Sequence, residues 1–364
     1  FLASRFDECM ASGGEFHQRV LLPLFFGTLN TPIHRRAPAA RRFGAVPFLN
    51  GGLFTRTPLE RRHADARFSD ETLGELFSQL LGAYRFTARE EQGRWSEVAI
   101  DPEMLGRAFE SLMASRERRA SGAYYTPQAL VAHVADQALI SALAEAPLSR
   151  EPLHRALNGG SLDESAASVL RERLRGFTVL DPASGSGAFL VYLLERITLL
   201  HRAAGDGRAV ATIRRDVLAQ AIHGVDVNPT AVWLCELRLW LSVVIESNEM
   251  QMSAVCPLPN LDCNVRVGDS LAGDGFVEPP ALVGPSAALV RLRDRYLRAA
   301  GPRKAPLRRA IARDEARRAL AAIDRQLLAV AAARRERLRE RRSPDLFGEY
   351  DRSAGASASD GRLL

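Results

Sequence analysis

The chain has 364 residues, 46% of them hydrophobic and 25% charged, so it can bury a substantial core and divides into about two or three domains. No run reaches the roughly 18 apolar residues that a membrane span needs, and no secretion leader opens the sequence. The four cysteines include no CxxC pair and no metal-ligand spacing with the seven histidines. These features argue against membrane, secreted and metal-dependent classes and predict a soluble protein of the reducing cytoplasm.

The positive charge is concentrated in one segment. The net charge is +6, yet residues 303–342 alone contain fourteen Lys or Arg against five Asp or Glu, so the rest of the chain is slightly acidic. Lys304 is the one lysine of the sequence, and the other basic residues are arginines, which suit bidentate contacts with phosphate. The sequence leaves two interpretations of this segment open, a nucleic-acid contact and a solvated helix.

Residues 1–115 are predicted to form a mostly helical accessory region. Short apolar runs such as LLPLFF and EMLGRAFESLM alternate there with Arg- and Pro-rich connections such as HRRAPAARR. The helix that follows is predicted to start within SGAYYTP, with Thr126 as its cap and Pro127 in its first position. Leu130, Val134 and Ala138 fall on one face of that helix and form its predicted apolar stripe.

Residues 116–275 show the pattern of a parallel α/β fold. Three short apolar segments, FTVLD, AIHGVD and NVRVGD, are predicted strands, and helical stretches separate them. The helix after the first strand takes its apolar stripe from Phe189 to Leu200, and Asn228 with Pro229 opens the helix after the second. Beyond this sheet we expect an arginine-rich helical insertion over residues 276–345 and a disordered tail over residues 346–364.

The first strand runs into a glycine turn, VLDPASGSGAFL, and three ligand classes use a turn of this kind. A phosphate-binding P-loop needs GxxxxGK[ST], which the chain lacks because its lysine lies at position 304. A dinucleotide fingerprint needs a third glycine where Leu190 stands, and an acid about 20 residues further on. Asp226 instead lies 39 residues beyond Gly187, so the dinucleotide pattern fits poorly.

S-adenosylmethionine fits the turn better, because it offers a cationic methionine end, a ribose diol and an adenine amine. An acid can pair with each of these groups, and the carboxyl ends of parallel strands share one crevice. We therefore expect Asp181 and its turn at the methionine end, Asp226 on the ribose and Asp269 on the adenine amine. The turn residues predicted to approach the cofactor are Pro182, Ala183, Gly185 and Gly187.

At the level of whole motifs the sequence resembles the γ-type adenine-specific DNA methyltransferases, in particular restriction-modification methylases of the Eco57I kind and their phage-defence relatives. SGAYYTP, VLDPASGSGAFL, GVDVNPTAVWLCELRLWL and PLPNLDCNVRVGDSL are similar to successive motifs of that family, and the resemblance spans about residues 45–272. It implies a Rossmann-like sheet, S-adenosylmethionine as methyl donor, and the N6 amine of adenine in double-stranded DNA as acceptor. It also implies that Thr126 and Pro127 lie at the methionine end of the cofactor, and that restriction or defence-system subunits are partners.

The sequence departs from the family at its catalytic motif, Asn-Pro-Pro-Tyr. That motif does not occur, since EPPA at 278–281 has only the prolines, and no catalytic residue is assigned. We expect the chain to be the front part of a longer enzyme, in which case an unpaired strand edge would make it aggregation-prone or a weak cofactor binder.

Other functions remain open at this stage. The chain can be a non-catalytic cofactor- and DNA-binding subunit of a defence complex, or a methylase that acts on a protein glutamine. A nuclease of the PD…(D/E)xK type is disfavoured, because no lysine precedes position 304.

Overall fold

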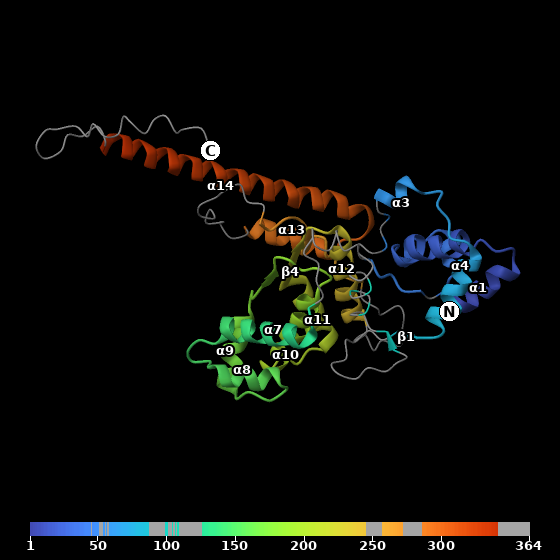
Figure 1. Ribbon diagram of the computed structural model, residues 1–364, viewed down its shortest axis with the longest axis horizontal. Coiled ribbons are helices and arrows are strands. Elements are labelled where there is room, and N and C mark those ends of the chain that lie inside the picture. The colour runs from blue at the N-terminus through green and yellow to red at the C-terminus, as the bar shows by residue number, and fades with distance from the viewer. Residues whose placement is uncertain are drawn as a thin grey trace, which may run out of the picture. The chain divides into compact units, whose positions relative to one another are not determined.

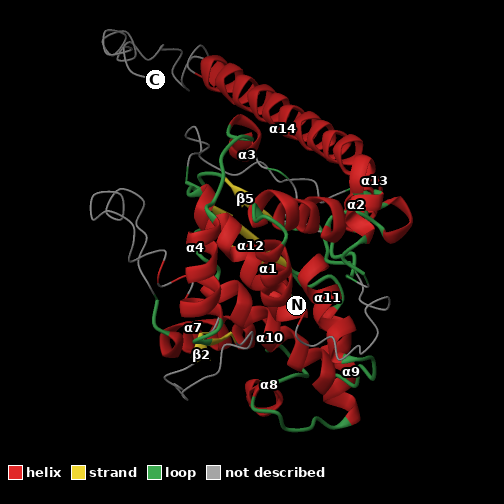
Figure 2. Cartoon of the chain, turned by 90° about the vertical axis from the view of Figure 1, so that its right-hand side faces the viewer, coloured by secondary structure: helices red, strands yellow, loops and turns green. Residues whose placement is uncertain are grey.

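The computed structural model describes residues 1–44, 46–50, 54, 56, 58–86, 99–100, 104, 106, 108, 126–244, 257–271 and 286–340. The chain divides into two compact units, the first comprising residues 1–272 and 296–304 and the second residues 273–295 and 305–364. Figure 1 follows the elements along the chain, and Figure 2 shows that helices predominate over strands. No helix in the described ranges is both long and apolar enough to cross a bilayer.

Short helices make up most of the first eighty residues. The elements are α1 (Leu2–Ala11), η1 (His17–Leu21), η2 (Pro23–Leu29), η3 (Ile33–Arg35), α2 (Pro38–Arg41), α3 (Pro58–Arg62), α4 (Asp70–Glu75) and η5 (Leu76–Leu81). They are held together by the aromatic rings of Phe6, Phe16 and Phe77, whose centroids lie 5.1, 5.3 and 5.5 Å apart. Among the described residues of 1–115, the predicted mostly helical character is confirmed, apart from two short parallel strands, β1 (Arg85–Phe86) and β2 (Ala99–Ile100).

The central sheet is parallel and has the strand order β3–β4–β5. Its strands are β3 (Val179–Asp181), β4 (Ile222–Asp226) and β5 (Val265–Val267), each within a segment that the sequence predicts as a strand. Helices connect consecutive strands, as parallel pairing requires. The described residues therefore form an α/β fold with a small three-stranded sheet and mostly helical content.

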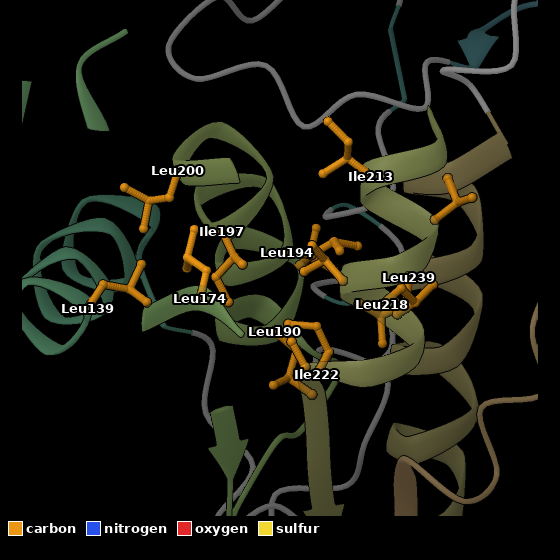
Figure 3. Close-up of a cluster of buried hydrophobic side chains, with 14 of the residues drawn as sticks. Leu139, Leu174, Leu190, Leu194, Ile197, Leu200, Ile213, Leu218, Ile222 and Leu239 are labelled. Atoms are coloured by element: carbon orange, nitrogen blue, oxygen red, sulfur yellow. The ribbon is translucent and has the colours of Figure 1, made fainter. Parts of the chain in front are cut away.

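The core of this fold lies between the sheet and the helices that connect its strands. α10 (Ala188–Ala203) and α11 (Val210–Gln220) connect β3 to β4, and α12 (Pro229–Val244) connects β4 to β5. Three further helices precede β3 and pack against α10, namely α7 (Gln128–Leu143), α8 (Arg150–Leu157) and α9 (Glu164–Leu174). Leu190, Leu194, Ile197 and Leu200 of α10 are at most 1% exposed and point into a cluster of aliphatic side chains (Figure 3). The apolar stripe predicted for α10 is thereby confirmed.

The start of α12 agrees with the sequence, whereas the start of α7 does not. The Asn228 side-chain oxygen accepts a hydrogen bond from the N–H of Thr230 at 2.9 Å and so caps α12. α7 begins at Gln128, and Pro127 occupies the cap position without a side-chain cap. The carbonyl of Pro127 accepts the first helical hydrogen bonds, so Thr126 lies before the helix and the prediction of Thr126 as its cap is wrong.

The buried face of α7 also differs from the predicted one. Leu130 and Val134 are 51% and 45% exposed, while Val131 and Ala135 are buried against α10. α7 is apolar on most of its circumference, so the packing partner rather than the periodicity selects its buried side.

The sheet is packed on one face in the described part of the chain. Ile222, Gly224 and Val265 are buried, whereas Leu180, on the opposite face of β3, is 65% exposed. β4 is the one strand paired with β3 among the described residues. The expected unpaired strand edge and its effect on aggregation and cofactor binding stay predictions.

Residues 296–304 belong to the first unit and are fixed there by two buried asparagines. The side-chain amides of Asn50 and Asn260 both donate to the carbonyl of Ala299, at 3.0 and 2.9 Å. The hydroxyl of Tyr296 donates to Asp262 at 2.5 Å. The VPFLN stretch that contributes Asn50 is therefore structural, since it holds this returning segment against the α/β fold.

The remaining elements are α13 (Ala287–Leu297), η6 (Gly301–Arg303) and α14 (Lys304–Glu340). α14 has 37 residues and is drawn as one continuous red helix in Figure 1. Within the second unit, Arg293 of α13 and Glu315 of α14 form an ion pair at 2.8 Å. The predicted disordered tail, residues 346–364, lies outside the described residues.

Candidate functional site

Three aspartates lie at the carboxyl-terminal edge of the sheet. Asp181 is the last residue of β3, Asp226 the last of β4, and Asp269 follows the end of β5 by two residues. The strand register places Asp181 opposite Gly224, and Asp226 opposite Val267. The structure therefore brings the three predicted carboxylates to one edge.

The turn between β3 and α10 contains two glycines with positive φ, and they serve different needs. Gly187, at φ 90°, caps α10, and a Cβ on it would lie 2.6 Å from the sulfur of Cys235. Gly185 has φ 52°, but a Cβ there would meet nothing within 4 Å. Close packing therefore requires glycine at 187, whereas Gly185 leaves open space beside the turn.

Backbone and side-chain hydrogen bonds join this turn to the ends of β4 and β5. The N–H of Gly185 donates to Oδ2 of Asp226 at 2.8 Å, and the N–H of Asn228 donates to Oδ1 of the same carboxylate at 2.8 Å. On the other side, the Ser270 hydroxyl donates to the carbonyl of Pro182 at 2.7 Å. The Asp226 carboxylate is thus oriented by two backbone groups, and the loops after all three strands form one connected structure.

The turn is electrostatically suited to a cation. Burial raises the pKa of Asp181, the nearby charge of Asp226 raises it further, and the Ala183 N–H, which donates to Oδ1 of Asp181 at 3.0 Å, lowers it in part. A positively charged group that binds beside Asp181 favours the ionised form of its carboxyl group. A cationic ligand would therefore be stabilised at this edge.

Thr126 and Pro127 directly precede α7, which packs on α10, the helix that follows the glycine turn. Arg196 of α10 forms a bidentate pair with Asp136 of α7, at 2.7 and 2.6 Å, and the Tyr192 hydroxyl donates to the same carboxylate. Val131 and Ala135 of α7 are buried against Tyr192 of α10, so the two helices pack directly on each other. The predicted place of Thr126 and Pro127 beside the cofactor stays a prediction. Thr126 is half-buried and Pro127 exposed.

Sequence reasoning missed three side chains that shape this turn. Ser184 and Ser186 are 5% and 8% exposed, and Arg238 of α12 is 2% exposed. Nη1 of Arg238 donates to the carbonyl of Ser186 at 2.8 Å. One signal in the sequence could have indicated the contact of Arg238: an arginine within the largely apolar run LCELRLWL needs hydrogen-bond partners if it is buried.

Among the described residues, neither a metal centre nor an exposed thiol nucleophile accompanies this edge of the sheet. They contain no cluster of three or more histidine, cysteine or carboxylate side chains able to hold a metal ion. A pocket lined by Phe177, His201 and Ala221 lies before the amino ends of β3 and β4, opposite to the aspartates. Cys235 is fully buried, and burial raises the pKa of its thiol, so it is not a reactive nucleophile.

Comparison with known proteins matches the segment that contains this site. Residues 100–260 match the family model described as N-6 DNA methylase. Over 287 residues the chain is 29% identical to a putative type II restriction enzyme and methyltransferase of Methanocaldococcus jannaschii, a match that takes in 71% of this chain and 24% of that protein. The chain thus spans about a quarter of the length of this curated relative.

Among solved structures, the fold is similar to the type IIL restriction-modification enzyme MmeI, determined in complex with DNA. The identity is 20% and the TM-score 0.48, over 74% of this chain and 34% of that one.

Proposed function

We propose that this chain provides the S-adenosylmethionine-binding part of a DNA methyltransferase that modifies the N6 amine of adenine, of the γ type seen in Eco57I-like methylases. The match of residues 100–260 to N-6 DNA methylases supports this proposal. The observation that carries it is the Asp226 carboxylate, which two backbone N–H groups orient beside a glycine turn and a second carboxylate, Asp181. The parallel sheet would then be the first part of a Rossmann-like methyltransferase fold.

The residues present fit this cofactor. Its sulfonium and ammonium groups are cationic, and the pKa of Asp181 is raised where such a charge would be stabilised. Open space beside Gly185 would allow close approach to the backbone. When bound, the cofactor supplies an electrophilic methyl group to an attacking amine.

Each predicted site residue has a role in holding the cofactor. Asp181, with Pro182, Ala183 and the turn, would hold the methionine part, and Thr126 with Pro127 would border it from α7. Asp226 has lone pairs left on both oxygens after accepting the N–H groups of Gly185 and Asn228, and it would accept the ribose hydroxyls. Asp269 is exposed and would accept the adenine amine.

The acceptor would be an adenine turned out of double-stranded DNA, since the amine of a stacked base cannot reach a donor held at a strand edge. We assign no catalytic residue within this chain. The restriction enzyme and methyltransferase from Methanocaldococcus jannaschii supports a place in a restriction-modification or defence system, with other subunits or domains of that system as partners.

Calorimetric titration with S-adenosylmethionine tests the cofactor assignment. We expect the protein to bind the cofactor, Asp226→Ala to weaken binding by at least about tenfold, and Asp65→Ala, in an exposed turn after α3, to leave it unchanged. A folded protein without affinity would contradict the proposal. Transfer of labelled methyl groups to duplex DNA would then separate an enzyme from a cofactor-binding subunit.

A further inference from the structure

Arg238 is a buried charge on α12, a helix whose buried residues are otherwise mostly apolar. Its side chain is 2% exposed, and its helix neighbours Cys235 and Leu239 are fully buried. Burying a guanidinium group in such surroundings costs free energy of folding unless its N–H groups donate hydrogen bonds. Its contacts therefore show what it is placed there to hold.

Two of its contacts are made with the glycine turn, across 52 positions of sequence. Nη1 of Arg238 donates to the carbonyl of Ser186 at 2.8 Å and approaches the hydroxyl of the same residue at 3.3 Å. A third segment packs against this pair, because a Cβ on Gly106 would lie 2.7 Å from the Ser186 hydroxyl and 3.4 Å from Nη1 of Arg238. Residues 106, 186 and 238 thus meet in one buried contact.

The contact fixes one peptide plane of the turn from both ends. The plane between Ser186 and Gly187 carries the Ser186 carbonyl, held by Arg238, and the Gly187 N–H, which donates to the carbonyl of Ser184 at 2.8 Å. Gly187, on one side of this plane, has φ 90°, and Gly185, one residue before Ser186, has φ 52°, so the plane lies in a stretch whose glycines allow other backbone conformations. The neighbouring Gly185 N–H is directed at Asp226 at 2.8 Å.

We propose that Arg238 is a positioning residue that holds the glycine turn in its cofactor-binding conformation, with Gly106 as the close-packed support on its other side. This inference rests on the proposed function, in which the turn receives the methionine part of the cofactor. Arg238 acts through Ser186 and does not touch the cofactor. An arginine suits the task because its fork of N–H donors keeps a fixed direction, which a lysine ammonium does not.

Gly106 connects this arrangement to the segment that precedes α7. An added methyl at position 106 would press on the Ser186 hydroxyl, and there is no room for it unless Ser186 or Arg238 moves. The conformation of the turn is therefore coupled to the position of Gly106. A substitution at Gly106 should disturb the turn although that residue is remote from it in sequence.

The test compares Arg238→Met, Arg238→Lys, Gly106→Ala and Ser186→Ala with a control. Leu200→Ala removes a fully buried side chain at the far end of α10, away from the turn. For each variant, Tm and the dissociation constant for S-adenosylmethionine are measured, the latter well below every Tm. Amide hydrogen exchange of Gly187 reports the turn itself without cofactor.

We expect Arg238→Met and Gly106→Ala to weaken cofactor binding by about tenfold or more, because a hydrogen bond from a charged donor is removed or displaced. Arg238→Lys should recover part of that affinity, and Ser186→Ala, which keeps the carbonyl contact, should cost less than about threefold. Leu200→Ala should lower Tm without changing affinity. Exchange at Gly187 should accelerate in Arg238→Met and Gly106→Ala only.

Two results would overturn the inference. One is an Arg238→Met protein that binds cofactor as the unsubstituted protein does, with Gly187 exchange unchanged. The other is a loss of affinity in Leu200→Ala that matches its loss of stability, since Arg238 would then be one structural residue among many. If Arg238→Met does not fold, Gly106→Ala decides by the same criteria. If the unsubstituted protein binds no cofactor, the proposed function fails, and Gly187 exchange still decides whether Arg238 holds the turn.

Discussion

Substitution by alanine at each of the two glycines of the turn distinguishes an effect on stability from an effect on cofactor binding. Gly185→Ala should cost about 1 kcal/mol of stability, from left-handed backbone strain alone, because its Cβ meets nothing within 4 Å. Gly187→Ala should cost about 3 kcal/mol, because its Cβ would overlap Cys235 in addition to the strain. The free energy of unfolding, measured with urea, checks both values.

The same pair should behave differently toward S-adenosylmethionine. The methyl group of Gly185→Ala projects into the space where we place the cofactor, so affinity should fall by at least about tenfold in a protein that remains folded. Equal affinity in Gly185→Ala and the unsubstituted protein would mean that the cofactor does not approach this turn.

Asp181→Asn should stabilise the protein and weaken its cofactor binding. Burial and the charge of Asp226 raise the pKa of Asp181 above its unfolded value, so ionised Asp181 destabilises the fold. This penalty is absent below the unfolded pKa and grows as pH rises through the folded pKa. At neutral pH the amide should raise Tm by roughly 2 °C, and this gain should vanish near pH 3. Asp65→Asn, at an exposed site, is the control.

Binding should show the opposite pH dependence. Pairing with a cation favours ionised Asp181, so cofactor affinity should fall as pH decreases through the raised pKa, at a higher pH than an ordinary aspartate would give. Titrations between pH 4 and pH 8 check this. A pH-independent affinity, or a destabilised Asp181→Asn protein, would remove Asp181 from the methionine end.

At the scale of residues, the positions of the three aspartates could be predicted from the sequence, whereas the hydrogen bonds that hold the turn beside them could not. Asp181, Asp226 and Asp269 follow apolar strands, and the ends of parallel strands meet at one edge, so local pattern and topology are sufficient. The hydrogen bond from Gly185 to Asp226 and that from Arg238 to Ser186 join residues 41 and 52 positions apart. Such contacts depend on how α12 packs on the turn, which no local pattern in one sequence contains.

At the scale of elements, the ion pair between α7 and α10 sets the position of α7. The Asp136 and Arg196 side chains are 24% and 14% exposed, and Arg196 also donates to the carbonyl of Leu157 at 2.7 Å. Asp136→Asn should cost about 2 kcal/mol, somewhat less than a fully buried pair would. It should also weaken cofactor binding slightly, because Thr126 and Pro127, which we place beside the cofactor, directly precede α7.

A double-mutant cycle isolates the pair. Asp136→Ala, Arg196→Ala and the double variant should give a coupling energy of about 1–2 kcal/mol in urea unfolding. Additivity of the two single effects would show that the contact does not hold the helices together, and that α7 is positioned by Val131 and Ala135 packing alone.

The boundaries of strands and the faces of helices were the weakest sequence predictions. FTVLD has five residues, yet β3 is confined to the three that pair with β4. α10 has a distinct apolar stripe and its core face was predicted correctly, whereas α7 presents apolar residues on both sides and its face was not. The buried face of a helix is predicted correctly where its polar and apolar sides differ clearly. Where they do not, tertiary packing determines which face is buried.

At the scale of the whole molecule, charge is the feature that the sequence predicts best. The arginine-rich segment is the long helix α14, and Arg313, Arg325 and Arg335 are exposed along it. The helix also exposes apolar side chains, with Leu320, Leu327 and Val330 each 62% exposed. Composition alone could not reveal that charged and apolar side chains are exposed on the same helix. The arginines suit contact with DNA, whereas the apolar side chains suit contact with a protein.

Replacing Arg313, Arg325 and Arg335 together by Gln tests whether α14 contacts the DNA backbone. Removing one arginine–phosphate ion pair should reduce the slope of log affinity against log salt by about 0.9, so we expect a shallower slope and roughly tenfold weaker binding of duplex DNA near 0.1 M salt. The decrease in affinity should be the same for unrelated sequences, because phosphate contacts carry no base information.

The matched control is Arg150→Gln, Arg175→Gln and Arg202→Gln, which removes equal charge from exposed positions of the first unit. If net charge alone governs DNA binding, both triple variants will lose affinity equally. If the α14 variant keeps the original slope and instead changes the sedimentation of the protein, α14 is a protein-binding helix and its apolar side chains mark the interface. A larger change of slope in the α14 variant than in the control would place double-stranded DNA along this helix.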